Sequence, residues 1–216
     1  MLPERNVIRY TFGTERGDLL TTPKTMPATI TRPLGICDPG NDPAIYVACL
    51  ASYNRGVLHG AWINLGIAAT AEDIRECIAY ILELSLEPGA EEYAVHDSQL
   101  LPGCLSSTEW PDLDKLEEYA QTVCELSENG FAAYRIACDN EGEILSLDQF
   151  RDTYCGTYDR PEDYAEELME ESGDLENVPD WLRSNINWEG VWHDLDCDGY
   201  SATFVEGEGY AIFRPA

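Results

Sequence analysis

The sequence predicts an α+β protein. We expect an antiparallel three-stranded sheet plus helix on the N-terminal side, a helical middle, and acidic helices plus a β-hairpin on the C-terminal side. Hydrophobic residues make up 44% of the chain, which is enough for a core and argues against global disorder. Short apolar runs between turn residues indicate strands, and longer runs with apolar residues at helical spacing indicate helices. A chain of 216 residues fits one large domain or two to three small ones, so length does not decide their number.

Residues 1–43 are rich in Thr, Pro and Gly and contain one β-like run at 6–12. We expect an N-terminal extension here, mobile or loosely docked. The chain has no run of roughly 18 apolar residues, so we expect no membrane span. It begins without the charged-then-apolar pattern of a signal peptide, so we expect a cytoplasmic protein.

Residues 44–108 predict an α+β domain. Thr70 with Asp73 three residues later resembles a capping box and marks a helix start. The first two strands flank a turn, so we expect a hairpin that a third strand joins. The expected elements are strands at 44–50, 57–65 and 92–97 and a helix at 70–84.

Residues 109–156 predict a mostly helical domain, and residues 157–216 an acidic α+β domain. The segment 131–138 fits a helix or a strand, and we favour a helix. The remaining expected elements are helices at 113–126, 147–153, 159–176, 180–186 and 188–195, and a hairpin of strands 201–205 and 210–214.

The net charge restricts the function more than any motif does. The chain has 13 basic and 41 acidic residues, for a net charge of −28. Such self-repulsion opposes compaction, so a folded chain with this charge is salt-adapted, binds cations, or presents an anionic surface to a basic partner. Direct binding to nucleic acid is not expected, because it needs Lys and Arg.

The densest acidic run lies between 159 and 176 and is predicted to be helical. Its apolar stripe is Tyr164, Ala165, Leu168 and Met169. Two carboxylate ladders share the helix, Glu162–Glu166–Glu170 and Asp163–Glu167–Glu171, and Asp174 and Glu176 follow them. At about 1.5 Å per residue, six acids over nine steps give one charge per ~2.3 Å, against ~1.7 Å in duplex DNA. A solvated surface helix is the alternative interpretation.

Other chemistry is less well supported by the sequence. Residues 194–199 resemble the start of a calcium loop, but position 12 is Val205 instead of the bidentate Glu. The histidines are His59, His96 and His193, and no nucleophile motif accompanies them. The eight cysteines lie more than four residues apart, so we expect free thiols, mostly buried, and no zinc knuckle. We expect no catalytic residues, no metal and no cofactor.

Five segments, in this order, resemble the ArdA-type antirestriction proteins. They are IYVACLASYNRGVLHGAWINL, EEYAVHDSQLLP, GTYDRPEDYAEELMEESG, NVPDWLRSNINWEG and HDLD, within residues 44–216. Residues 1–43 have no counterpart in the shorter members, and residues 127–150 match poorly, so the fold of that stretch stays open.

The resemblance implies an acidic protein of a mobile genetic element that mimics B-form DNA and inhibits Type I restriction–modification enzymes. It also implies elongated homodimers with three small domains per chain, and an antirestriction motif that falls on 174–187 here. The eight acids from Glu162 to Glu176 named above would stand in for phosphates. An acidic calcium-dependent or salt-adapted binding module is the alternative, and a hydrolase is the least favoured hypothesis. The antirestriction motif also supplies the candidate dimer contact, although its apolar residues could equally belong to the chain's own core. Its residues are Val178, Pro179, Asp180, Trp181, Leu182, Ile186 and Trp188.

Overall fold

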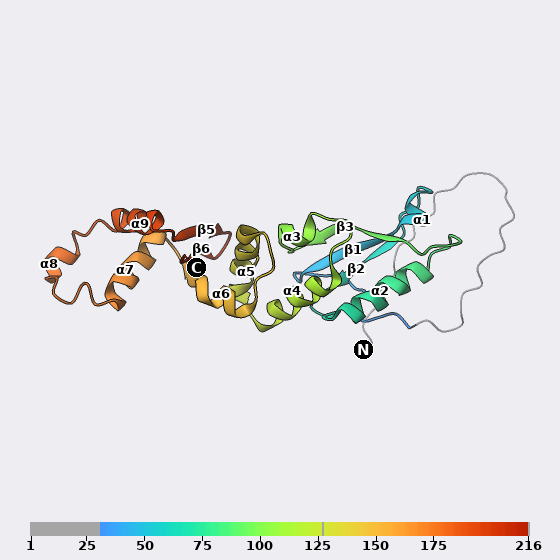
Figure 1. The fold of residues 1–216 in the computed structure, drawn as a ribbon, viewed down its shortest axis with the longest axis horizontal. Coiled ribbons are helices and arrows are strands. Elements are labelled where there is room, and N and C mark those ends of the chain that lie inside the picture. The colour runs from blue at the N-terminus through green and yellow to red at the C-terminus, as the bar shows by residue number, and fades with distance from the viewer. Residues whose placement is uncertain (1–30, 127, 216) are drawn as a thin grey trace, which may run out of the picture.

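The chain folds into an elongated α+β molecule with two small sheets separated along its long axis (Figure 1). The computed structural model describes residues 31–126 and 128–215. Within these residues there are six strands and nine helices. Helices α4 to α6 lie between the two sheets, and helix α8 lies at the end farthest from the N-terminal sheet.

The N-terminal sheet confirms the predicted hairpin and its third strand. Its strands pair antiparallel in the order β2-β1-β3. Strand β2 begins at Gly60, three residues later than predicted, because Val57 and Leu58 are exposed in the loop that follows the turn at 54–56. The short helix α3 was not predicted. The elements are β1 (Ala44–Cys49), α1 (Leu50–Tyr53), β2 (Gly60–Asn64), α2 (Ala71–Glu83), β3 (Tyr93–Gln99) and α3 (Gly103–Ser106).

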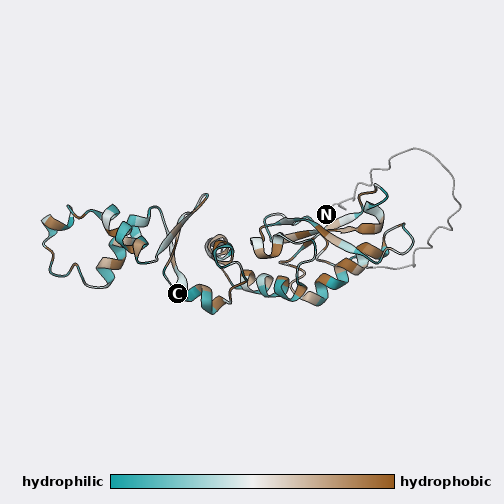
Figure 2. Cartoon of the chain, turned by 45° about the horizontal axis from the view of Figure 1, so that its top comes forward, coloured by the Kyte–Doolittle hydropathy of each residue, from teal (hydrophilic) through white to brown (hydrophobic). Residues whose placement is uncertain are grey.

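Helix α2 covers this sheet with an apolar face. Ile74, Cys77, Ile78 and Ile81 are buried at the helical spacing seen in the sequence. Figure 2 shows hydrophobic colouring along the strands of this sheet and alternating colouring along the helices. The predicted cap is present, because the Thr70 side chain accepts a hydrogen bond from the Asp73 N–H at 3.1 Å.

The end of the predicted N-terminal extension belongs to this packing. Ile36 is 4% exposed and forms a bridge with Ile63 of β2. The Asn64 N–H donates to the Gly35 carbonyl at 2.9 Å. Residues 35 and 36 therefore pack as a part of the sheet's edge. The β-like run predicted at 6–12 lies outside the described residues.

The middle of the chain is helical, and the ambiguous segment 131–138 is a helix. Helix α6 begins with a full capping box between Ser146 and Gln149. The helices are α4 (Leu113–Glu125), α5 (Glu128–Glu141) and α6 (Leu147–Thr153).

The C-terminal sheet contains the predicted hairpin and one strand that was not predicted. Its order is β4-β6-β5, all antiparallel. Strand β4 follows α6 directly and pairs with β6, which comes more than fifty residues later. The elements are β4 (Tyr154–Tyr158), α7 (Pro161–Glu171), α8 (Asp180–Arg183), α9 (Trp188–Cys197), β5 (Ser201–Val205) and β6 (Gly209–Phe213).

Three predicted helix ends need correction. Helix α7 stops at Glu171 instead of 176, because Gly173 follows in a left-handed conformation with φ of 82°. Helix α8 stops at Arg183 instead of 186, where the Asn185 side chain donates to the Trp181 carbonyl at 2.8 Å. Helix α9 extends to Cys197, two residues past the prediction.

A row of aromatic rings joins the middle helices to the C-terminal sheet. Consecutive ring centroids are 5.6, 5.4, 4.9 and 5.8 Å apart, and the rings are Tyr119, Tyr134, Phe150, Tyr154 and Phe213. One buried apolar cluster extends from Ile36 to Phe213. The division into three domains at 109 and 157 therefore stays a prediction.

The eight cysteines are all free, as expected. Only three of them are buried, so the expectation that most are core residues is wrong; the buried ones are Cys49, Cys77 and Cys138. Among the described residues, no helix combines the length and apolar character needed to cross a membrane.

Candidate anionic interaction surface

Helix α7 is the centre of the acidic C-terminal end. Pro161 begins it, which suits the first turn because proline lacks an N–H and has a fixed φ. Tyr164 and Ala165 are buried, and Leu168 and Met169 are half-buried, so the predicted apolar stripe docks the helix. The ring of Tyr164 meets the ring of Tyr200 at 5.9 Å.

The carboxylates of α7 divide into two groups. Glu162 and Asp163 are half-buried, and Asp163 is ion-paired with Arg160 at the start of the helix. The four acids farther along the helix are exposed: Glu166, Glu167, Glu170 and Glu171. They occupy five helical steps, so one carboxylate occurs about every 1.9 Å along the axis. The exposed part of α7 is therefore at least as dense in charge as the sequence predicted.

Tyr158 of β4 lies against this helix. Burial, and then the nearby Glu167 carboxylate, which accepts a hydrogen bond from the Tyr158 hydroxyl, together raise the pKa of Tyr158 to about 12. The neutral Tyr158 hydroxyl therefore donates a hydrogen bond to one of the exposed carboxylates, that of Glu167. Sequence reasoning missed this contact, because β4 was not predicted.

The loop after α7 carries the last two predicted acids. Asp174 and Glu176 are exposed, and Asp174 accepts a hydrogen bond from the Ser172 hydroxyl at 2.6 Å. Leu175 between them is buried and anchors the loop. These two acids lie beyond the helix and do not continue its ladders.

Arg183 organises the same loop. Its guanidinium donates to the Leu175 carbonyl at 2.5 Å and to the Val178 carbonyl at 3.2 Å. A planar guanidinium can serve two acceptors at once, which lysine cannot do with the same geometry. Arg183 thus fixes the backbone of the loop. None of the eight residues 170–177 is basic, and four of them are acidic.

The segment from 178 to 188 exposes its apolar side chains unevenly. Trp181 is 71% exposed and Leu182 is 42% exposed, at the outer end of the molecule. Val178, Ile186 and Trp188 are half-buried, and Pro179 and Asp180 are exposed. The sequence left two interpretations of this segment: a dimer contact or a part of the chain's own core. Trp181 is not buried in that core.

The residues considered for other chemistry are dispersed. Asp194 and Asp196 lie within α9, so they do not form the extended loop that calcium coordination at this spacing requires. His59 contacts the Ile81 carbonyl at 2.7 Å, His96 packs against Tyr53, and His193 lies on α9. In the part of the chain that the structure describes, no three His, Cys, Asp or Glu side chains are grouped as a metal site requires.

Comparison with known protein families gives one match. The family model described as antirestriction protein (ArdA) matches residues 45–210. This is well over half of the chain, and it contains every helix of the described fold and all or part of every strand. The chain belongs to the ArdA antirestriction family. A search of curated proteins gave no match.

ArdA membership confirms the resemblance found in the sequence segments. The matched range contains all of α7, the Arg183-bound loop and α8, so the acidic surface lies inside the family region. It excludes residues 1–44, most of which were predicted as the extension. ArdA proteins are described as antirestriction proteins, and the partner of such proteins is a restriction–modification enzyme.

Proposed function

We propose that this ArdA protein is a non-enzymatic inhibitor that mimics B-form DNA and occupies the DNA-binding groove of a Type I restriction–modification enzyme. The observation that carries the proposal is the row of exposed carboxylates on α7, at a linear density close to that of duplex phosphates. Lys and Arg side chains that pair with phosphate can pair with carboxylate in the same way.

The state of these carboxylates supports a role in binding. Among the ion pairs of the described residues, none involves Glu166, Glu167, Glu170 or Glu171. Like charges four residues apart destabilise a helix slightly, so the arrangement does not serve stability. A cationic partner would relieve this repulsion when it binds. The inhibitor needs no cofactor and does not itself bind nucleic acid.

We further propose that the active species is a homodimer. A dimer carries twice the charge of one chain, which is −28. At about 1.7 Å per charge this would correspond to at most roughly 95 Å of duplex. Trp181 and Leu182 form an exposed apolar patch at the end of the molecule, where two acidic chains can meet with less repulsion than elsewhere.

The test compares two double variants in a pull-down with a Type I methyltransferase core at two salt concentrations. Glu166→Gln with Glu170→Gln removes two exposed charges, and Glu166→Asp with Glu170→Asp keeps them at the same sites. At about 1 kcal/mol per carboxylate, the Gln pair should bind roughly thirtyfold more weakly and depend less on salt.

The Asp pair is the matched control and should stay close to the wild-type protein. Equal binding by the wild-type protein and the Gln pair would contradict the assignment of α7. Binding that does not change with salt would contradict groove mimicry as a whole, because ionic contacts weaken as salt rises.

A further inference from the structure

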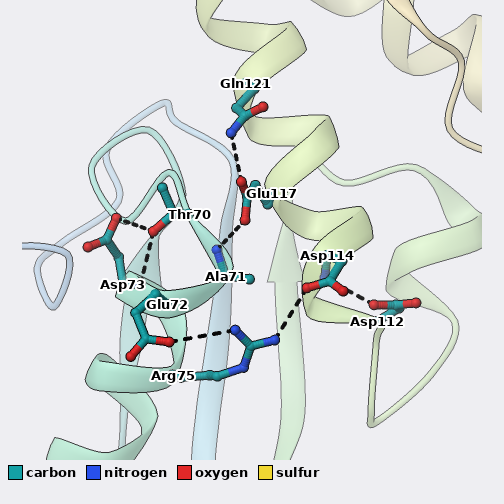
Figure 3. A network of polar contacts seen from close by, with 9 residues as sticks. All are labelled: Thr70, Ala71, Glu72, Asp73, Arg75, Asp112, Asp114, Glu117 and Gln121. Atoms are coloured by element: carbon teal, nitrogen blue, oxygen red, sulfur yellow. Dashed lines mark hydrogen bonds and ion pairs between the residues drawn. The ribbon is translucent and has the colours of Figure 1, made fainter.

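Helices α2 and α4 meet end to end where the N-terminal sheet joins the middle helices (Figure 3). The carboxylate of Glu117, one turn into α4, accepts a hydrogen bond from the N–H of Ala71 at 2.7 Å. Ala71 is the first residue of α2, and the N–H groups of a first helical turn have no partner inside their own helix. A side chain of one helix thus caps the other.

Two further side chains, those of Gln121 and Arg75, lie around this bond. The Gln121 side chain donates to the second oxygen of Glu117 at 2.9 Å, which orients the carboxylate. Arg75 lies 3.3 Å from Asp114 and 3.8 Å from Glu72. All three of these side chains are more than half exposed, and such exposed pairs contribute little. The bond from Ala71 to Glu117 is therefore the main polar link between the two helix ends.

The environment of Glu117 separates it from the acids beside it. Glu117 is half-buried and its two oxygens are both engaged, whereas its neighbour Glu118 is exposed. A carboxylate next to the positive end of a helix is electrostatically favourable, so the negative charge of Glu117 is used inside the molecule.

We propose that Glu117 is a positioning residue for inhibition, which rests on the proposed function. It sets the direction of α2 and the N-terminal sheet relative to the rest of the chain. A duplex presents its charges at regular intervals, so a mimic that contacts one groove with several of its parts must hold those parts at fixed separations. Glu117 acts through this spacing and not through contact with the partner.

Other contacts keep the two parts attached when Glu117 is removed. The Tyr119 hydroxyl donates to the Leu100 carbonyl at 2.7 Å, and the apolar cluster continues across the junction. Loss of the Glu117 carboxylate should therefore change the range of angles between α2 and α4 without unfolding either part.

The experiment uses three variants of the full chain. Glu117→Ala removes the acceptor, and Glu117→Gln removes the charge but keeps an oxygen for the Ala71 N–H. Glu118→Ala removes the same charge from the adjacent exposed site. Spin labels carried by a non-natural amino acid at Ala79 and Cys124, which are exposed on α2 and α4, report the distance between the helices. A DNA-cleavage assay with a Type I enzyme reports inhibition.

Glu117→Ala should broaden or shift the distance distribution and weaken inhibition roughly threefold to tenfold. Glu118→Ala should keep the wild-type distribution, with inhibition changed little. Glu117→Gln keeps the acceptor for the Ala71 N–H but loses the charge, so it should lie closer to wild type than Glu117→Ala does. An unchanged distribution in Glu117→Ala, inhibition equal to that of Glu118→Ala, or a Gln variant that behaves like Ala would each overturn the proposal. A wild-type protein that does not inhibit would refute the proposed function instead, whereas the distance measurement needs no enzyme and still decides whether Glu117 links the helices.

Discussion

Replacing Arg183 by Ala tests how the loop between α7 and α8 is held. The change removes two hydrogen bonds, to the carbonyls of Leu175 and Val178. A bond from a charged donor contributes about 1.5–3 kcal/mol when buried, and Arg183 is only half-buried. We therefore expect a loss of about 2 kcal/mol in local stability for the two bonds together, which raises the open population of the loop roughly thirtyfold.

Amide hydrogen exchange measures this opening directly. The N–H groups of Glu176, Val178 and Ile186 are hydrogen-bonded within the segment and should exchange roughly thirtyfold faster in Arg183→Ala. Amides of β4, β5 and β6 should keep their wild-type rates, because the opening is local. Inhibition should weaken as well, since Asp174, Glu176 and Trp181 lose their fixed positions.

Two variants separate geometry from charge. Arg183→Lys keeps the charge but cannot hold both carbonyls with the same planar geometry, so its exchange rates should lie between those of wild type and Ala. Arg151→Ala removes one positive charge from an exposed site on α6 and should leave residues 174–187 unaffected. Wild-type exchange rates throughout 174–187 in Arg183→Ala would refute the role assigned to the guanidinium.

Two more predictions follow from the C-terminal end. The pKa of Tyr158 is about 12 in the fold and about 10 in the unfolded chain, so between these values the folded state binds the additional proton and stability falls as pH rises. Unfolding followed by circular dichroism from pH 9 to 12 should show this loss, and Tyr158→Phe should make it shallower; identical pH curves would contradict it. Trp181→Asp should convert dimers to monomers in light scattering at micromolar concentration, whereas Leu58→Asp, at an 81% exposed site near the other end, should not. A wild-type monomer at that concentration would remove the basis of the dimer proposal.

Local signals in the sequence were sufficient for most elements. The hairpin of β1 and β2, helix α2 with its Thr70 cap, and the hairpin of β5 and β6 each combine a clear periodicity with a recognisable start or turn. The apolar stripe of α7 was read from helical spacing. The two carboxylate ladders did not separate the exposed acids from Glu162 and Asp163, which are half-buried.

The parts that were missed depend on contacts distant in sequence. Strand β4 is short, half-buried and interrupted by Gly156 with φ of 126°, and its partner β6 is more than fifty residues away. Arg183 binds the backbone carbonyls of Leu175 and Val178, and such a contact leaves no pattern in the amino-acid sequence. Glu117 and Ala71 are 46 residues apart on two different helices, so spacing along the chain could not indicate their contact.

The row of rings from Tyr119 to Phe213 has a mechanical consequence. Duplex DNA is stiff over about 150 base pairs, and a protein groove that accepts it meets a nearly straight rod. A chain whose parts moved freely relative to one another would lose that conformational entropy on entering such a groove, and the loss would weaken binding. Stacked aromatic side chains resist bending because each ring fills the space beside the next. For the DNA mimicry that we propose, a rigid interior of this kind is needed as well as a negatively charged exterior.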